Sequence, residues 1–559
     1  MTAFMTKASK PFFIFIFFLL AGGMLSACLR YELQWDFHNY HYYNGFSFLN
    51  GRLGYDLAPG YQMTFNNPLL DVITYLTASA FNRKIIVYSF IMGLYFGGLL
   101  YILFQLNKLF FNIGTRKGKA ALILSMALGV TGFATWFQIG SSTGEIPVSI
   151  LVLSGLYILI RHWFVLKDIS KKTFFLAGFL LGTGAALKLT AAMYCITSGI
   201  TVLLFFKKLP RPAHSICWFV LGGLAGFLLF NGFWMIMLYK EYQNPFFPFF
   251  NAVFKSPYFP EINTRDTIHT LGNTWFTRLM LPLMTICHSK AFPIVGNASF
   301  TDFRFLVFFI LLIELLCKRF FKHEPPLQDT TKFIIIFTII SYCFWIYLFS
   351  IIRYTIPIES MIGILVTKTL FDKREEKRFE INDIAFYLKD FIICFLLLST
   401  PLISKEWSKF PSDNVWLFIN PDNVELSENS LVFLVNPRTS STFVPIARKN
   451  PKIRAISFYA PELLFWNTDG SITNYGKFKE KKEEIIKNHI GDILMIIKSD
   501  PTDSFPEKNV EIFADILKKA QCFYPEFSFT KDGKQNTIFT KDFRFCKISK
   551  NSDTLLNEE

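Results

Sequence analysis

Residues 11–28 read PFFIFIFFLLAGGMLSAC, and residues 85–107 read IIVYSFIMGLYFGGLLYILFQLN. Neither stretch contains a charged side chain, and each is long enough as a helix to cross a bilayer core of roughly 30 Å. Nine further apolar runs lie at 120–138, 146–166, 173–187, 189–206, 215–239, 304–317, 332–350, 355–370 and 390–403. The sequence therefore predicts a polytopic α-helical membrane protein with about 11 transmembrane helices.

Composition favours a membrane protein over a soluble one. Of the 559 residues, 52% are hydrophobic and 18% are charged, whereas charged residues make up about 25% of a typical soluble domain. Phe alone accounts for 67 residues, and the mean hydropathy is +0.34. Such a composition excludes a disordered chain, a collagen and a small disulfide scaffold.

The net charge of +15 belongs to the first 403 residues, because residues 404–559 contain 22 basic and 22 acidic side chains. This distribution indicates topology signals rather than nucleic-acid binding. Basic residues gather in alternate connecting segments, at 7–10, 108–119, 161–172, 207–211, 318–332 and 368–389. The positive-inside rule assigns these segments, and with them the N-terminus, to the cytoplasm.

Two domains follow from this pattern. Residues 1–403 are predicted to form a transmembrane domain with a long first outside loop at 29–84, and residues 404–559 a soluble domain on the outer side. In the tail, strand-like runs at 430–435, 453–458, 492–497 and 537–539 alternate with helical runs at 477–488 and 508–520. That alternation predicts a small α/β domain.

Two predictions concern the cysteines. Residues 25–28 (LSAC) follow a basic start and an apolar run, so Cys28 is either a lipidated cleavage site or part of an uncleaved first helix. Cys522 and Cys546 flank a predicted hairpin of the tail and are expected to form a disulfide in an oxidising compartment, the alternative being two unpaired thiols. The chain contains no CxxC or HExxH pattern typical of a metal site.

The first outside loop opens with WDFHNYHYYN at residues 35–44, followed by GYDLAPG at 54–60 and QMTFNNPLLD at 62–71. The pattern from Asp36 to Leu49 is compatible with a helix that places Asp36, Tyr40 and Tyr43 about a turn apart. An acid just outside the bilayer can act as a general base for a hydroxyl. The alternative is an interfacial aromatic helix with a capping Asp.

Four ionisable residues stand within or beside apolar runs. Glu145 begins the run at 146–166, where it suits either a helix N-terminus or a site acid. Lys188 lies between two apolar runs, where it either reaches the interface or binds a phosphate. Arg353 and Glu359 flank a very short outside link, where they either pair with each other or hold a phosphate together.

These stretches resemble the GT-C fold glycosyltransferases that use polyprenol-phosphate sugars, and more closely bacterial membrane proteins related to glycosyltransferase family 87. The resemblance rests on the order and spacing of WDFHNYHYYN, GRLGYDLAP, TFNNPLLD, GAALKLT, NPFFPFFNAVFKSPYF and IIRYTIPIE, within residues 30–360. It implies a bacterial inner (plasma) membrane enzyme with a cytoplasmic N-terminus and a periplasmic tail. Its partners would be the bilayer, a polyprenyl-phosphate sugar donor, and a glycan, lipid or protein acceptor, with no nucleic acid.

The resemblance also implies roles for individual residues. Asp36 would be the catalytic base of an inverting transfer, and Lys188 and Arg353 would hold the leaving lipid phosphate. The remaining substrate-binding candidates are His38, Tyr40, Asp56, Asn66, Asn67, Glu145 and Glu359. GT-C enzymes often carry paired acids in this loop, but Phe37 follows Asp36 here, so the second acid is Asp56, Asp71, Glu145 or absent. No cofactor is certain; the sequence is compatible with a divalent metal but does not indicate one.

Two other functions fit the same residues. A transporter or flippase for lipid-linked sugars would also use intramembrane Lys188 and Arg353 for an anionic headgroup, although the chain shows no internal repeat of the transporter kind. A non-catalytic envelope scaffold would use the tail to bind partners.

Overall fold

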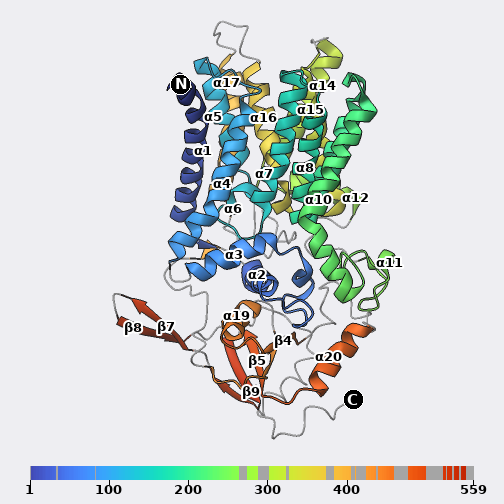
Figure 1. Ribbon diagram of the computed structural model, residues 1–559. Coiled ribbons are helices and arrows are strands. Elements are labelled where there is room, and N and C mark those ends of the chain that lie inside the picture. Colours follow the sequence, from blue (N-terminus) through green and yellow to red (C-terminus); the bar gives the residue numbers. More distant parts are fainter. Residues whose placement is uncertain are drawn as a thin grey trace. The chain divides into compact units, whose positions relative to one another are not determined.

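A computed structural model describes residues 2–29, 31–32, 35–81, 84–263, 274–286, 301–322, 326–372, 383–404, 409–410, 424–435, 439–458, 476–498, 520–523, 526–531, 534–539 and 543–548. The chain divides into two compact units. The helical unit comprises residues 1–29, 89–232 and 266–407 (Figure 1). The α/β unit comprises residues 30–88, 233–265 and 408–559.

A helix coincides with each of the 11 apolar runs. The helices are α1 (Thr2–Cys28), α4 (Ile85–Asn107), α5 (Arg116–Val130), α7 (Glu145–Ile158), α8 (Lys171–Leu187), α9 (Ala192–Leu204), α10 (Pro212–Tyr242), α14 (Arg304–Lys322), α15 (Asp329–Leu348), α16 (Ile356–Asp372) and α17 (Asp383–Leu398). Within the helical unit, α16 packs against α5 and α15, and α8 packs against α7 and α9. These helices therefore form one bundle.

Five helical segments of the described chain are long and apolar enough to cross a membrane. They are Pro11–Cys28, Ile85–Asn107, Glu145–Val165, Pro212–Tyr242 and Asp329–Leu348. Helices such as α5, with 15 residues, and α9, with 13, are shorter than a bilayer requires when taken alone. The total of 11 membrane-spanning helices therefore stays a prediction.

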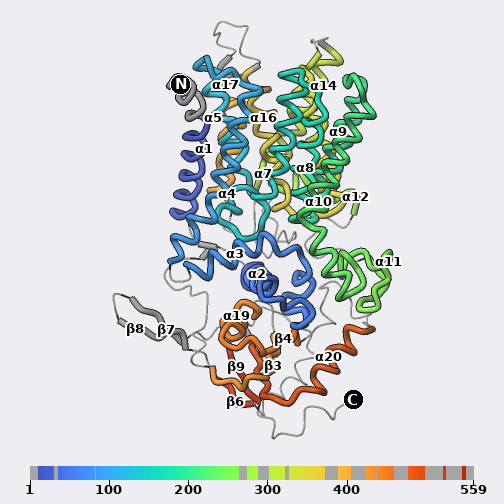
Figure 2. The backbone as a smooth tube through the Cα atoms, in the orientation of Figure 1, coloured from blue at the N-terminus to red at the C-terminus, as the bar shows by residue number. Residues whose placement is uncertain are grey.

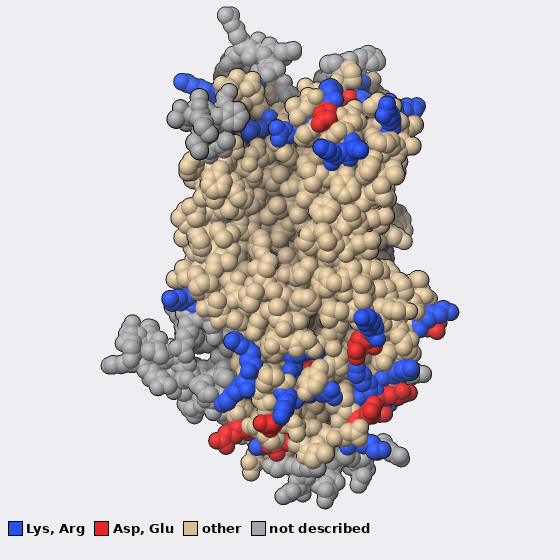
Figure 3. Space-filling view, in the orientation of Figure 1, with Lys and Arg blue, Asp and Glu red and all other residues tan. Residues whose placement is uncertain are grey.

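The surface of the helical unit is apolar where lipid would contact it. Large side chains such as Phe17, Ile123 and Leu229 remain exposed, each by more than 60%. On the face drawn in Figure 3, a broad band of the bundle carries no charged residues, and Lys and Arg gather at one end of this band. An exposed apolar band of this extent is unusual for a soluble protein and typical of one surrounded by lipid.

Small residues bring α1 and α4 into close contact. A Cβ atom added to Gly22 would lie 2.2 Å from the backbone nitrogen of Gly97. Gly93 and Gly97 are four residues apart on α4, which is the small-residue spacing that lets membrane helices approach closely. The Ser26 hydroxyl of α1 donates a hydrogen bond of 2.7 Å to the carbonyl of Ser89.

The α/β unit contains a five-stranded sheet in the order β4-β3-β5-β9-β6. Figure 2 labels the backbone trace of β3, β4, β6 and β9. The strands are β3 (Leu431–Leu434), β4 (Arg454–Ser457), β5 (Ile493–Lys498), β6 (Gln521–Phe523) and β9 (Phe543–Ile548). β3 is parallel to both β4 and β5, whereas β9 is antiparallel to β5 and β6. Helix α19 (Ser440–Lys449) connects β3 to β4, and α20 (Lys477–Lys487) lies between β4 and β5 in the chain. Parallel neighbours with helical connections form the expected βαβ arrangement.

The described strands β3, β4 and β5 and helix α20 overlap the runs predicted from the sequence. The predicted helical run at 508–520 lies almost entirely outside the described residues. β7 (Glu526–Lys531) and β8 (Lys534–Phe539) pair as an antiparallel hairpin. Cys522 and Cys546 are opposite each other on β6 and β9, and their sulfur atoms form a disulfide.

The first outside loop belongs to the same compact unit as the tail. It folds into η1, a π-helical turn at Phe37–His41, then α2 (Tyr42–Leu49), a 3-10 turn η2 (Tyr61–Phe65) and α3 (Leu69–Ala80). Leu57 and Phe65 of this loop share a buried core with Phe433 and Met495 of the sheet. The predicted soluble domain at 404–559 thus shares its core with a segment far away in sequence.

Candidate functional site

Three interruptions of helices in the helical unit bring Glu145, Lys188 and Arg353 together; we call these residues the Lys188 cluster. Glu145 begins α7 directly after Gly144, whose φ of 83° suits a residue without a side chain. Lys188 has an extended backbone between α8 and η4 (Leu189–Ala191). Arg353 lies in the short turn η6 (Ile352–Thr355) between α15 and α16.

Glu145 is the shared partner of the two cations in the Lys188 cluster. Its Oε1 atom lies 2.6 Å from Lys188 Nζ and 3.3 Å from Arg353 Nε. Lys188 Nζ also donates a hydrogen bond of 2.7 Å to the carbonyl of Thr143. Tyr354 lies beside both cations, with its ring centroid 5.7 Å from Lys188 Nζ.

The Lys188 cluster carries one more positive charge than negative charge. The side chain of Glu145 is 4% exposed, while those of Lys188 and Arg353 are 20% and 14% exposed. The second oxygen of Glu145, Oε2, is buried without a hydrogen-bond partner among the described residues. Lys188 and Arg353 both lie at the Glu145 carboxylate, and a phosphate would match the charge of both cations.

Glu359, considered above beside Arg353, accepts hydrogen bonds from α6 (Phe133–Phe137). Its carboxylate accepts hydrogen bonds from the amides of Ala134 (2.9 Å) and Thr135 (3.0 Å) at the start of this helix. The Thr135 hydroxyl donates a further bond of 2.6 Å. Glu359 is fully buried, and these bonds tie α16 to α6. Arg353 has an ion pair with Glu145.

A second buried pair, Asp302 and Arg304, lies near Glu359. Asp302 accepts a bond of 2.8 Å from Arg304 Nη1 and another of 3.0 Å from the amide of Phe133. Arg304 also donates to Leu128 O, Thr131 Oγ1, Thr400 Oγ1 and Leu397 O. The guanidinium therefore joins α5, α14 and α17. Sequence reasoning missed this pair, although an Arg at the head of an apolar run was a signal for it.

Asp36 lies in the α/β unit at the start of the π-helical turn. It is 8% exposed and occupies the N-cap position of η1 with a helical backbone. Tyr40 on the same turn is buried.

Two contacts attach this turn to helix α19. His38 Nδ1 lies 3.0 Å from the Ser441 hydroxyl of α19, and the Ser440 hydroxyl donates a bond of 2.5 Å to the carbonyl of Asn39. Helix α19 thus fixes the turn that carries Asp36.

Asp56 belongs to a closed polar network with Arg52 and Tyr43, which we call the Arg52 network. Arg52 Nε and Nη2 donate to the two Asp56 oxygens at 2.5 and 2.7 Å, and the Tyr43 hydroxyl donates at 2.7 Å. Arg52 also donates to the carbonyls of Pro451 and Ile453, and Asp56 accepts from the amide of Ala455. The network therefore attaches the first loop to β4.

Burial and charge shift the pKa values in the Arg52 network. Burial raises the pKa of the Tyr43 hydroxyl well above its ordinary value, and the charge of Asp56 adds to that effect. Burial alone would lower the pKa of Arg52, but its hydrogen bonds and charge interaction with Asp56 raise it overall. Both oxygens of Asp56 are therefore occupied by donors within the protein.

The two asparagines predicted to shape the site have local partners. Asn67 Oδ1 accepts a hydrogen bond of 3.0 Å from the amide of Leu69 at the start of α3. Asn66 Nδ2 lies 3.4 Å from the sulfur of Met63. The structure gives both residues a position in the turn between η2 and α3. The Lys188 cluster belongs to the helical unit, whereas Asp36, His38, Tyr40, Asp56, Asn66 and Asn67 belong to the α/β unit.

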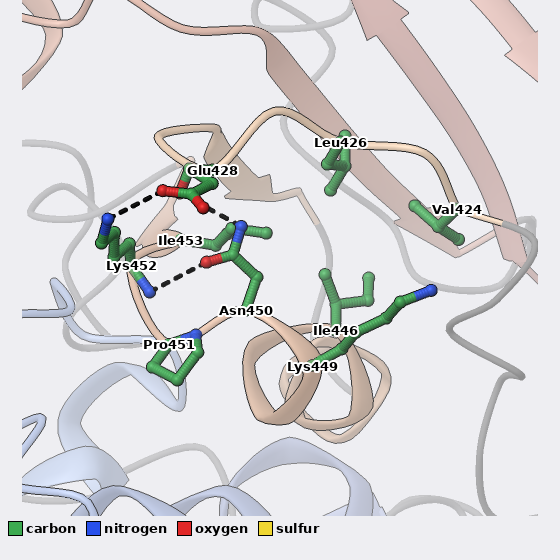
Figure 4. Close-up of a pocket in the computed structure, with 9 residues that line it drawn as sticks. All are labelled: Val424, Leu426, Glu428, Ile446, Lys449, Asn450, Pro451, Lys452 and Ile453. Carbon is green, nitrogen blue, oxygen red and sulfur yellow. Dashed lines mark hydrogen bonds and ion pairs between the residues drawn. The ribbon is translucent and has the colours of Figure 1, made fainter.

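A cavity of about 500 Å³ lies in the tail part of the α/β unit (Figure 4). Its walls include apolar Val424, Ile446 and Ile453, while Glu428 and Lys452 form an ion pair of 2.7 Å at its rim. None of the predicted site residues lines this cavity. Among the described residues there is also no group of three or more His, Cys, Asp or Glu side chains placed to hold a metal.

No protein-family model matches the sequence, and no curated protein matches it. One similar solved structure is the crystal structure of ArnT from Cupriavidus metallidurans bound to undecaprenyl phosphate. The likeness has a TM-score of 0.51 at 14% sequence identity and covers 99% of this chain and 100% of that one. The chain is thus a helical membrane protein with a GT-C type of fold. This likeness supports the GT-C fold and is not specific to family 87.

Proposed function

We propose that this chain is a membrane glycosyltransferase that moves a sugar from a polyprenyl-phosphate donor to an envelope glycan, lipid or protein on the periplasmic side of a bacterial inner membrane. The observation that carries the proposal is the Lys188 cluster, in which two cations share one carboxylate within apolar helices. The fold likeness to ArnT, a protein solved with undecaprenyl phosphate bound, supports it.

The proposed reaction is an inverting transfer. Asp36 accepts the proton of an acceptor hydroxyl as that oxygen attacks the anomeric carbon of the sugar. The bond between the anomeric carbon and the phosphate oxygen breaks, and the polyprenyl phosphate leaves with the bonding electron pair. Lys188 and Arg353 stabilise the charge that develops on that phosphate. Glu145 balances one of the two cations until the lipid binds.

Sugar transfer in purified membranes tests the proposal. Membranes containing wild-type protein, Asp36→Asn or the surface control Asp492→Asn would be supplied with a panel of radiolabelled polyprenyl-phosphate sugars. Asp492 pairs with Lys547 on the tail, at 3.1 Å between partly exposed side chains, so its change should leave transfer intact. We expect transfer by wild type and the control and at least a 100-fold loss in Asp36→Asn at equal protein level.

Full transfer by Asp36→Asn would refute the role of this acid as the base. Sugar translocation across vesicles without transfer, unchanged in Asp36→Asn, would instead identify a transporter for lipid-linked sugars. The Lys188 cluster would then serve to bind the anionic headgroup during translocation.

A further inference from the structure

A buried His–Asp pair joins His41, the last residue of the π-helical turn η1, to Asp71 of α3. His41 Nδ1 is 2.6 Å from Asp71 Oδ1, and both side chains are at least nine-tenths buried. Asn44 Nδ2 donates a bond of 3.1 Å to the other Asp71 oxygen and one of 2.9 Å to the carbonyl of Met63. The Asp71 carboxylate therefore has partners on both oxygens and holds His41 in one orientation.

The pair leaves one hydrogen-bond acceptor unused. In the tautomer that donates from His41 Nδ1 to the Asp71 carboxylate, Nε2 carries no proton and accepts hydrogen bonds. His41 Nε2 is buried and has no hydrogen-bond partner among the described residues, and the same holds for Asn44 Oδ1. A buried acceptor without a donor is costly, so the fold retains this atom at the expense of stability.

The π-helical turn brings His41 to the face of the helix that carries Asp36. In this turn the backbone bond spans five residues, as from the Tyr42 amide to the Phe37 carbonyl. The rings of Phe37 and Tyr42 accordingly stack with centroids 5.6 Å apart. Asp36 and His41 are also five residues apart, so they lie on one face, whereas in a continuous α-helix they would diverge. Single π turns occur frequently at functional sites.

We propose that His41 Nε2 accepts a hydrogen bond from a hydroxyl of the donor sugar and thereby makes His41, held by Asp71, a sugar-binding residue. This inference rests on the proposed function, since it needs a sugar beside Asp36. The chemistry favours the sugar: an imidazole nitrogen without a proton needs a hydrogen-bond donor, and the hydroxyls of a sugar supply one, whereas the phosphodiester and the polyprenyl chain of a polyprenyl-phosphate sugar carry none.

Two variants separate this role from packing. His41→Asn keeps a side-chain N–H close to the position of Nδ1, so it retains a donor for Asp71, but it has no atom at the position of Nε2. The matched control is His162→Asn, because His162 Nδ1 also pairs with an Asp, Asp168 at 3.1 Å, in an exposed site. Thermal unfolding of each purified variant reports whether the fold is retained.

The experiment measures binding to protein in nanodiscs of two probes, undecaprenyl phosphate and a panel of polyprenyl-phosphate sugars. For at least one sugar-bearing lipid, we expect His41→Asn to bind roughly tenfold more weakly than wild type. Undecaprenyl phosphate should bind equally to both proteins, and His162→Asn should match wild type for every lipid.

Equal binding of all sugar-bearing lipids by wild type and His41→Asn would overturn the inference and leave water as the partner of Nε2. It would also be overturned if wild type bound no sugar-bearing lipid more tightly than undecaprenyl phosphate. Because this experiment measures binding and not sugar transfer, its result does not depend on whether Asp36 acts as the base. A sugar effect at His41 with full transfer in Asp36→Asn would refute the proposed base while keeping the sugar contact.

Discussion

The Arg52 network and the Lys188 cluster are both buried groups of charged side chains, yet they differ in how their charges are balanced. In the Arg52 network, one Arg faces one Asp, and both Asp56 oxygens have donors. In the Lys188 cluster, two cations face one Glu, one of whose oxygens lacks a hydrogen bond among the described residues. A closed network holds the fold together, whereas an unbalanced one can bind a ligand.

The comparison separates two acids that the sequence presents alike. Asp56 and Glu145 both stand in turns next to small residues, and either could have been the second acid of the site. The structure places Asp56 between the first loop and β4, and it places Glu145 between the two cations. Of these two acids, Glu145 is therefore the better candidate for a residue that affects substrate binding.

The largest expected effect concerns the Arg52 network. Arg52→Ala leaves the Asp56 carboxylate buried beside Tyr43 without its cation, and it removes the bonds to Pro451 and Ile453. Breaking a buried ion pair by removing one partner costs about 3–5 kcal/mol of stability. Thermal unfolding in detergent should show a clear fall in Tm, and a Tm equal to that of wild type would contradict the structural role of the network.

Glu145→Gln should strengthen the binding of the lipid and lower the stability of the unbound protein. The charge of the Lys188 cluster rises from about +1 to +2, so undecaprenyl phosphate should bind several-fold more tightly, while the unbound protein loses about 1–2 kcal/mol. Binding in nanodiscs and thermal unfolding measure the two effects. Weaker binding of the lipid would show instead that Glu145 positions the two cations for it.

Tyr43→Phe should have the smallest effect, because it removes one hydrogen bond from an acid that keeps three donors. We expect a loss of about 1 kcal/mol near pH 8. The folded pKa of Tyr43 is raised, so its stabilisation is complete below the unfolded pKa of about 10 and is lost as the pH rises toward the folded value.

The pH dependence distinguishes this bond from simple packing. Wild type should lose more stability than Tyr43→Phe between pH 8 and pH 11, as measured by urea unfolding of the purified protein. Tyr42, whose pKa burial raises to about 12, is present in both proteins and cancels from the comparison. Identical declines in the two proteins would indicate that the Tyr43 hydroxyl does not titrate with unfolding.

The helices and strands could be predicted because their signals are local. Continuous apolar runs mark the positions of the helices of the bundle, and short runs rich in apolar residues mark β3, β4 and β5. Lys188 was also recognisable, since a lysine between apolar runs needs a partner. These features depend on neighbours in the sequence and not on the tertiary fold.

The pairing of distant charges could not be predicted in this way. Glu145 meets cations that are 43 and more residues away, and Glu359 binds amides more than 220 residues earlier in the chain. The sequence near Arg353 offered Glu359 as the simplest partner, because the two residues are close along the chain. The π-helical turn at Phe37–His41 also has no simple sequence signature, so the shared face of Asp36 and His41 emerged only from the structure.

The central claim, that the unbalanced Lys188 cluster binds a lipid phosphate, is tested most directly by one binding measurement. Undecaprenyl phosphate would be titrated into nanodiscs with wild type, with the double variant Lys188→Gln/Arg353→Gln, and with Lys452→Gln, which changes an exposed ion pair of the tail. We predict an affinity loss of about 100-fold or more in the double variant and none in Lys452→Gln. A folded double variant that binds the lipid as tightly as wild type would contradict the account.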